Sequence, residues 1–333
     1  MIATLLFAVF IITMMLGVPI GASLGLAGAA AIALANAEAP WFGLLAVPQN
    51  FYAGLGKYPL LAIPMFVLVG SIFDRSGVAL RLVNFAIALV GRGPGMLPLV
   101  AICVAMFLGG ISGSGPANAA AVGAVMIAAM NRAGYPASYS ASVVGAAAAT
   151  DILIPPSVAF IVYSVLVPGA SVPALFAAGM IPGVLAGIAL IVPAVWMARK
   201  HGMGHLESSL PRPPLLKSFI EAIWGLAAPV LILGGMRMGW FTPTEAAVVA
   251  VFYGLFVGLF VHRSMTLRDL FPILKESGEL SAVILLVVSL AGIFAFSLST
   301  LGVIDPITRA IVNSGLGEYG VLALLILMLI TIG

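Results

Sequence analysis

The sequence has very few charged residues and a single cysteine. Of its 333 residues, 8% are Asp, Glu, Lys or Arg and 62% are hydrophobic, and the mean hydropathy is +1.23. Soluble domains carry about 25% charged residues, so this composition excludes that class and predicts an all-α polytopic membrane protein. The lone Cys103 excludes an internal disulfide, and we interpret it as a small residue of an apolar helix.

Basic clusters and well-placed histidines are also scarce. The net charge of +3 comes from residues scattered through polar loops, so we expect no nucleic-acid partner. Residues 110–113 fit the loose Gly-x-Ser-Gly pattern of intramembrane serine proteases, but all three histidines lie in polar loops and supply no base. His201 and His205 lie near Glu207, but the intervening glycines disrupt a helical metal site, and we expect a solvated loop. We therefore expect no enzyme and no cofactor.

The chain is organised around a polar break at residues 109–118, with the sequence Gly-Gly-Ile-Ser-Gly-Ser-Gly-Pro-Ala-Asn. The apolar flanks, 96–110 and 119–130, are each shorter than the roughly 20 residues that a membrane-spanning helix needs. This pattern predicts a re-entrant hairpin over 96–131. Non-helical backbone deep in a membrane is tolerated only where protein buries it or where it lines a polar cavity, so the tip predicts a binding site.

A second break interrupts the apolar stretch 138–168. Pro155 and Pro156 remove two backbone donors and block the helix. We expect free carbonyls near Thr150 to Ile154 that can ligate a cation, and a helix restarting near Pro156 whose N-terminus faces an anion. The tip offers carbonyls and hydroxyls and a second helix N-terminus, near Ala117.

These two breaks supply the candidate site residues. Roughly five or six hard oxygens without a cluster of carboxylates suit Na⁺ better than Ca²⁺ or a transition metal. The candidate Na⁺ ligands are Ser112, Gly113, Ser114, Thr150, Asp151 and Ile154. The candidate substrate contacts are Asn118, Pro155, Pro156 and Ser157.

Asp151 is the one acidic residue that we expect deep in the membrane, where an ionisable group costs about 2.5–3.5 kcal/mol. Three roles remain open for it: a Na⁺ ligand, a proton carrier, or a buried acid bonded to Ser or Thr. Asn118 either caps the second hairpin helix or meets substrate. For the tip serines, the alternative to ligand binding is helix–helix packing by small residues.

Charge and internal similarity predict the topology. With the amino terminus outside, eleven of the 14 Lys and Arg residues fall inside, and only Lys57, Arg237 and Arg309 fall outside. Pro19 has a counterpart 224 positions later at Pro243, and Gly77 has one 225 positions later at Gly302.

These offsets predict inverted repeats over 1–200 and 218–333, joined by a cytoplasmic linker, 201–217. The second repeat stops where its own hairpin tip should begin. We therefore expect a fragment that lacks roughly 90 carboxy-terminal residues, if the repeats are equal in length.

Several motifs together resemble the large membrane subunit (DctM-like permease) of tripartite ATP-independent periplasmic (TRAP) transporters, and the resemblance covers the whole chain. They are 110–114 (Gly-Ile-Ser-Gly-Ser), 119–121 (Ala-Ala-Ala), 132–136 (Arg-Ala-Gly-Tyr-Pro), 154–157 (Ile-Pro-Pro-Ser), 175–183 (Leu-Phe-Ala-Ala-Gly-Met-Ile-Pro-Gly) and 241–247 (Phe-Thr-Pro-Thr-Glu-Ala-Ala).

The resemblance implies an elevator-type, Na⁺-driven importer of organic anions, such as C4-dicarboxylates or sialic acids, in a bacterial or archaeal inner membrane. It also implies a small membrane subunit and a periplasmic solute-binding protein as partners. The family commonly has an acidic residue where this chain has Asn118, and an uncharged one where it has Asp151. A stand-alone Na⁺- or H⁺-coupled anion carrier, a membrane enzyme and a channel are the alternatives.

Overall fold

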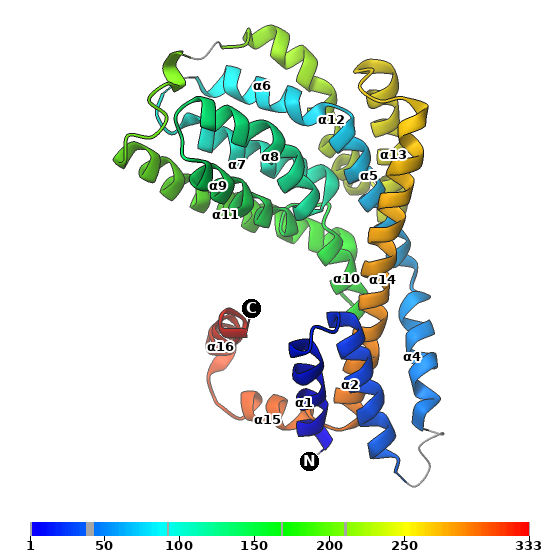
Figure 1. Cartoon of the computed structure of the whole chain (residues 1–333). Helices are drawn as coiled ribbons and strands as arrows, with labels where there is room; N and C mark the ends of the chain where they lie inside the picture. The colour runs from blue at the N-terminus through cyan, green and yellow to red at the C-terminus, as the bar shows by residue number, and fades with distance from the viewer. Residues whose placement is uncertain (1, 38–42, 92, 168, 210–211, 333) are drawn as a thin grey trace. The chain divides into compact units, whose positions relative to one another are not determined.

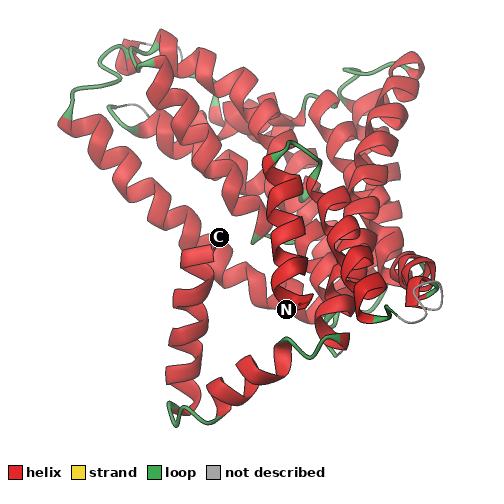
Figure 2. Cartoon of the chain, turned by 60° about the horizontal axis from the view of Figure 1, so that its bottom comes forward, coloured by secondary structure: helices red, strands yellow, loops and turns green. Residues whose placement is uncertain are grey.

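The computed structural model describes residues 2–37, 43–91, 93–167, 169–209 and 212–332. Within these ranges the chain forms helices joined by loops and contains no β-strand (Figure 2). Five of the helices are long and apolar enough to span a membrane: Tyr58–Arg75, Val172–Lys200, Leu215–Arg237, Pro243–Val261 and Leu267–Thr300. The prediction of an all-α polytopic membrane protein is confirmed.

The chain divides into two compact units. The first comprises residues 1–56 and 284–333. Its helices are α1 (Ile2–Met15), α2 (Ile20–Ala35), α4 (Ala46–Leu55), the second half of α14 (Leu270–Thr300), α15 (Ile304–Val312) and α16 (Gly317–Ile332). Helices α1 and α2 pack together. The Ser297 hydroxyl donates a hydrogen bond to the Gly28 carbonyl (3.0 Å), which connects α14 to α2.

The second unit, residues 57–283, contains all of the predicted site. Its helices are η1 (Tyr58–Leu61), α5 (Ala62–Arg75), α6 (Val78–Val90), α7 (Met96–Ser112), α8 (Gly115–Arg132), α9 (Ala137–Ala148), η2 (Ala149–Ile152), α10 (Val158–Leu166), α11 (Val172–Lys200), η3 (Glu207–Ser209), α12 (Leu215–Arg237), α13 (Pro243–Phe256), η4 (Val257–Val261), η5 (Leu267–Asp269) and the first half of α14 (Figure 1).

Helix α7 forms the core of this second unit. It packs against α5, α6, α8, α9 and α11, and 12 of its 17 residues are buried. An apolar helix that is buried on every side needs no polar face, which explains why its sequence shows little amphipathic pattern. The protein itself therefore surrounds the helix that leads into the tip, as non-helical backbone at membrane depth requires.

The polar break is much shorter than the sequence suggests. Helix α7 continues to Ser112 and α8 begins at Gly115, so only Gly113 and Ser114 join them. The second helix begins two residues before Ala117, close to the expected start, and Pro116 occupies its first turn, where its missing N–H is harmless. Of the two roles left open for Asn118, the cap is excluded, because Asn118 lies inside α8.

The repeat landmarks have similar local structure. Gly77 and Gly302 both have positive φ, of 70° and 63°, and each precedes a short helix, α6 and α15 respectively. Pro19 and Pro243 both stand at the start of a helix, α2 and α13. The inversion of the repeats and their boundaries stay a prediction, and residues 210 and 211 of the expected linker lie outside the described ranges.

Candidate functional site

The glycines of the hairpin tip pack directly on the interrupted segment. Gly113 is in the left-handed region (φ 59°), and a Cβ built on it would overlap the Pro156 carbonyl oxygen. A Cβ on Gly115 would come within 3.1 Å of the Ala148 carbonyl oxygen. Backbone therefore meets backbone here, and glycine is the residue that permits so close an approach.

The interrupted segment is held in shape by its own hydrogen bonds. The chain leaves helical geometry after Ile152 and re-enters it at Val158. The Thr150 carbonyl accepts from the N–H groups of Leu153 and Ile154 (3.0 and 3.1 Å), and the Ser157 hydroxyl donates to the Ile152 carbonyl (2.7 Å). The expectation that all carbonyls from Thr150 to Ile154 are freed is thus wrong for Thr150 and Ile152.

Four carbonyls of this segment remain without a hydrogen bond, although those of Leu153 and Pro156 pack against Gly179 and Gly113. Within the described chain, no hydrogen bond reaches the carbonyl oxygens of Leu153, Ile154, Pro155 and Pro156. The Thr150 hydroxyl, by contrast, donates to the Ala147 carbonyl (2.7 Å), and Thr150 is buried. The structure therefore favours the backbone around Ile154 and Pro155 over the Thr150 side chain as a source of cation ligands.

Two helix N-termini meet at this point. Ser114 is the N-cap residue of α8 and Ser157 is the N-cap residue of α10, and neither side chain caps its helix. Their first-turn N–H groups thus have no side-chain acceptor. Because Gly113 packs on Pro156, both positive helix ends lie at the contact between the tip and the interrupted segment. Such an arrangement can bind an anion.

Asn118 and Asp151 form a buried pair at the base of the tip. The Asn118 amide donates to Asp151 Oδ2 (2.6 Å) and to the Ala105 carbonyl (2.7 Å). Asn118 is 1% exposed and Asp151 is fully buried. The partner of the carboxyl is therefore an asparagine. Of the three roles left open for Asp151, a buried acid bonded to Ser or Thr is excluded.

This pair leaves two buried oxygens without partners. Among the described residues, neither Asn118 Oδ1 nor Asp151 Oδ1 receives a hydrogen bond. Unsatisfied buried oxygens are rare in native proteins, and each costs about 1–3 kcal/mol unless something binds it. Two hard oxygens, one of them from a carboxyl group, are suitable ligands for an alkali cation or an acceptor site for a proton.

The tip serines differ in their surroundings. Ser112 is buried beneath Gly70 of α5, and its Oγ accepts weakly from the Ser114 N–H (3.4 Å). Ser114 is half-buried, and its hydroxyl has no hydrogen bond within the part of the chain that the structure describes. The Ser114 hydroxyl is therefore the freer of the two to contact a ligand.

The sequence profile of one protein family, described as "Tripartite ATP-independent periplasmic transporter, DctM component", matches residues 7–333. The chain belongs to this family. It is 36% identical to the isethionate TRAP transporter permease protein DctMQ of Oleidesulfovibrio alaskensis, over 98% of this chain and 51% of that protein. It is 34% identical to the C4-dicarboxylate TRAP transporter large permease protein DctM of Rhodobacter capsulatus, over 99% of this chain and 77% of that protein.

A further DctM relative is the sialic acid TRAP transporter large permease protein SiaM of Vibrio cholerae. It is 37% identical to this chain, over 84% of this chain and 64% of that protein. The chain spans about half the length of the DctMQ relative and about three quarters of the Rhodobacter one.

The resemblance predicted departures from the family pattern at Asn118 and Asp151. These two residues lie 33 positions apart in sequence but share one hydrogen bond. The carboxyl at position 151 and the amide at position 118 therefore belong to one contact. Sequence spacing alone gave no signal for this contact.

Glu207 is buried, although the sequence predicts a solvated loop for it. Its exposed fraction is 4%. Its carboxylate accepts from the Leu97 N–H (2.9 Å) and from the Tyr135 hydroxyl (2.6 Å), and that hydroxyl accepts from the Gly95 N–H (2.7 Å). The segment after α11 thus closes over the base of the hairpin and provides an acceptor for the Leu97 N–H in the first turn of α7.

Replacing Tyr135 with phenylalanine is expected to destabilise this closure. The change leaves the buried Gly95 N–H without an acceptor and removes a donor to a buried carboxylate, at a cost of about 1–3 kcal/mol. Thermal unfolding of the purified protein measures the loss. Tyr139→Phe is the matched control, because Tyr139 stacks on Tyr135 but makes one bond, to the Ala194 carbonyl. Equal unfolding temperatures for the two variants would contradict the interpretation.

The same closure should weaken as the pH rises. Burial raises the pKa of Glu207 above its usual value, while the hydrogen bonds from Tyr135 and Leu97 oppose that shift. A carboxyl with a raised pKa stabilises the fold fully below its unfolded pKa, and this contribution is lost as the pH rises through the folded pKa. Glu207→Gln should flatten that pH dependence.

Proposed function

We propose that this chain is the large permease subunit of a sodium-coupled secondary transporter that imports small organic anions. The observation that carries the proposal is the meeting of two uncapped helix N-termini with free carbonyls and a buried carboxylate at one point. Cation ligands and an anion site that share a few residues provide a direct means of coupling.

The proposed mechanism uses this shared position. Na⁺ would bind oxygens of the tip and of the interrupted segment, with Ser112, Gly113, Ser114, Asp151 and Ile154 as candidate ligands. Its charge would hold Gly113 against Pro156 and so fix both helix N-termini. Substrate would then bind those N-termini near Pro155, Pro156 and Ser157. An elevator-type movement of this second unit's hairpin remains part of the proposal.

The names of the relatives support an anionic substrate. They specify isethionate, C4-dicarboxylate, 2,3-diketo-L-gulonate and sialic acid, all of which are small organic acids. Helix N-termini suit the carboxylate or sulfonate that these compounds share. We accordingly propose a small organic anion as substrate and leave its carbon skeleton open.

The proposed partners are a small membrane subunit and a periplasmic solute-binding protein. The DctMQ name of one relative supports the first, and the family description supports the second. We propose a multi-pass location in a bacterial or archaeal inner membrane with a periplasmic amino terminus. We also propose that the chain is not an enzyme, which its membership of a transporter family supports.

Uptake of labelled organic anions into proteoliposomes tests the function. Vesicles that contain this chain and the small subunit are assayed with and without a Na⁺ gradient and with and without the binding protein. Accumulation that requires both supports the proposal. Accumulation without the binding protein would support a stand-alone carrier, which remains the second candidate. Uptake driven only by a pH gradient would overturn sodium coupling and make Asp151 the proton carrier.

Ser114→Ala should raise the Na⁺ concentration that half-saturates uptake by about tenfold, which corresponds to about 1.4 kcal/mol of lost ligand interaction. Stability should change little, because the Ser114 hydroxyl has no hydrogen bond within the described chain. Ser142→Ala is the control, since Ser142 is exposed on α9 and bonds only to its own helix. An unchanged Na⁺ requirement in Ser114→Ala would remove this hydroxyl from the ligand set.

A further inference from the structure

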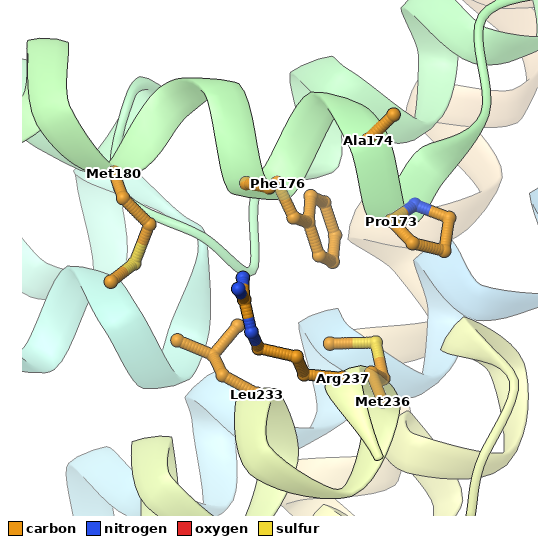
Figure 3. Close-up of a pocket in the computed structure, with 8 residues that line it drawn as sticks. Pro173, Ala174, Phe176, Met180, Leu233, Met236 and Arg237 are labelled. Carbon is orange, nitrogen blue, oxygen red and sulfur yellow. The ribbon is translucent and has the colours of Figure 1, made fainter. Parts of the chain in front are cut away.

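A separate, open cavity of about 380 Å³ lies between α11 and α12. Most of its lining residues are exposed, and Phe176 is the buried one among them. Figure 3 shows the first turns of α11 on one side and the last turn of α12 on the other. Its lining is apolar except for one cation: Pro173, Ala174, Phe176, Ala177, Met180, Leu233, Met236 and Arg237. The volume falls within the roughly 300–1,000 Å³ of small-molecule pockets.

The helices leave this space because each packs elsewhere. Helix α11 packs on α7 and, through Gly179 and Gly183, on the backbone at Leu153 and Ile154. Helix α12 packs on α6 and α13. The cavity therefore lies on a different face of α11 from the one that supports the candidate transport site.

Arg237 is exposed and has no partner among the residues that the structure describes. No hydrogen bond or ion pair involves it there, and its guanidinium points across the hollow toward α11, between Phe176 and Met180 (Figure 3). The last turn of a helix favours a cation, which explains why an arginine is placed on this turn. It does not explain why the side chain reaches into an apolar hollow.

We propose that this cavity binds an amphipathic anion, with its anionic head on Arg237 and its apolar chain between α11 and α12. A planar guanidinium pairs well with a carboxylate or a phosphate. Arg237 ends the candidate membrane span Leu215–Arg237, and the ends of such spans lie near the lipid head groups. The Phe176 and Met180 side chains supply the apolar wall that a hydrocarbon chain requires. This site does not depend on the proposed transport function.

The experiment measures binding to the purified full chain in neutral phosphatidylcholine nanodiscs. Dodecanoate is titrated calorimetrically, and phosphatidylglycerol is tested by retention in native mass spectrometry and by competition with dodecanoate. If phosphatidylglycerol competes with dodecanoate, the lipid is an occupant of the cavity. If dodecanoate binds and phosphatidylglycerol does not, the occupant is a free fatty acid. Dodecanol, which has the same chain without the charge, tests the need for the anion.

Arg237→Gln should weaken dodecanoate binding by at least tenfold, and Arg237→Lys should weaken it less. Ala177→Phe should also abolish binding, because it fills the cavity without changing the charge. Arg132→Gln is the control, an exposed arginine in the last turn of α8, and should bind as the native protein does. Unchanged dodecanoate affinity in Arg237→Gln, or equal affinity for dodecanol, would overturn the proposal.

Discussion

Asp151→Asn is expected to lower the rate of sodium-driven uptake by at least 100-fold without unfolding the protein. The two side chains have the same shape, and the Asn118 amide can still donate to an amide oxygen at position 151. Only the ability to carry a negative charge is lost. Burying an ion without a paired cation costs several kcal/mol, so the neutral variant should be at least as stable as the native chain.

Thermal unfolding with and without Na⁺ separates a ligand role from a structural one. A cation that binds the folded state raises the unfolding temperature with its concentration. Na⁺ should therefore stabilise the native chain and leave Asp151→Asn unaffected. Persistence of the Na⁺-dependent shift in Asp151→Asn would exclude the carboxylate as a ligand.

The reciprocal double variant is the more demanding test. Asn118→Asp combined with Asp151→Asn returns a carboxylate to the other side of the same hydrogen bond. Uptake should recover to within about tenfold of the native level, because residues in contact couple strongly. Asn118→Asp alone places two carboxyls in contact and should be the most damaging of the three. No recovery in the double variant would mean that the exact position of the charge matters.

Features that depend on residues close together in the sequence were predictable from the sequence. Glycine and proline change local backbone geometry, so residues 109–118 and Pro155-Pro156 correctly marked the two breaks. The apolar composition correctly predicted an all-α membrane protein. The size of the first break was overestimated because a proline in the first turn of a helix looks in sequence like a helix breaker, although it is well tolerated there.

Features that depend on tertiary packing were not predictable. The Asn118–Asp151 bond joins residues 33 apart, and the Tyr135–Glu207 bond joins residues 72 apart. Burial made Glu207 part of the hairpin base, although its Gly- and His-rich surroundings are typical of solvated loops. Local patterns carry no information about which distant side chain supplies a partner.

Gly109 and Gly110 show most clearly what the sequence cannot predict, because they are neighbouring residues of the same type. A Cβ on Gly109 would overlap the Asp151 carboxylate and lie 3.1 Å from the Asp151 Cα, a backbone atom that cannot move aside. A Cβ on Gly110 would make ordinary contacts, at 3.5 Å, with the Ile154 side chain and the Pro155 carbonyl oxygen. The structure therefore assigns close packing to one glycine and spare room to the other.

Gly109→Ala is accordingly expected to lower stability by about 1–3 kcal/mol through overpacking, and uptake by at least tenfold, because it displaces Asp151. Gly110→Ala should leave both close to native values, since alanine favours a helix interior by about 0.5–1 kcal/mol relative to glycine. Thermal unfolding and uptake of the two variants, measured side by side, test this difference between Gly109 and Gly110. Equal effects would mean that α7 does not meet Asp151 as described, and the carboxylate would then need another support. Loss confined to Gly109→Ala would show that the tip is built around the carboxyl that we propose as a ligand.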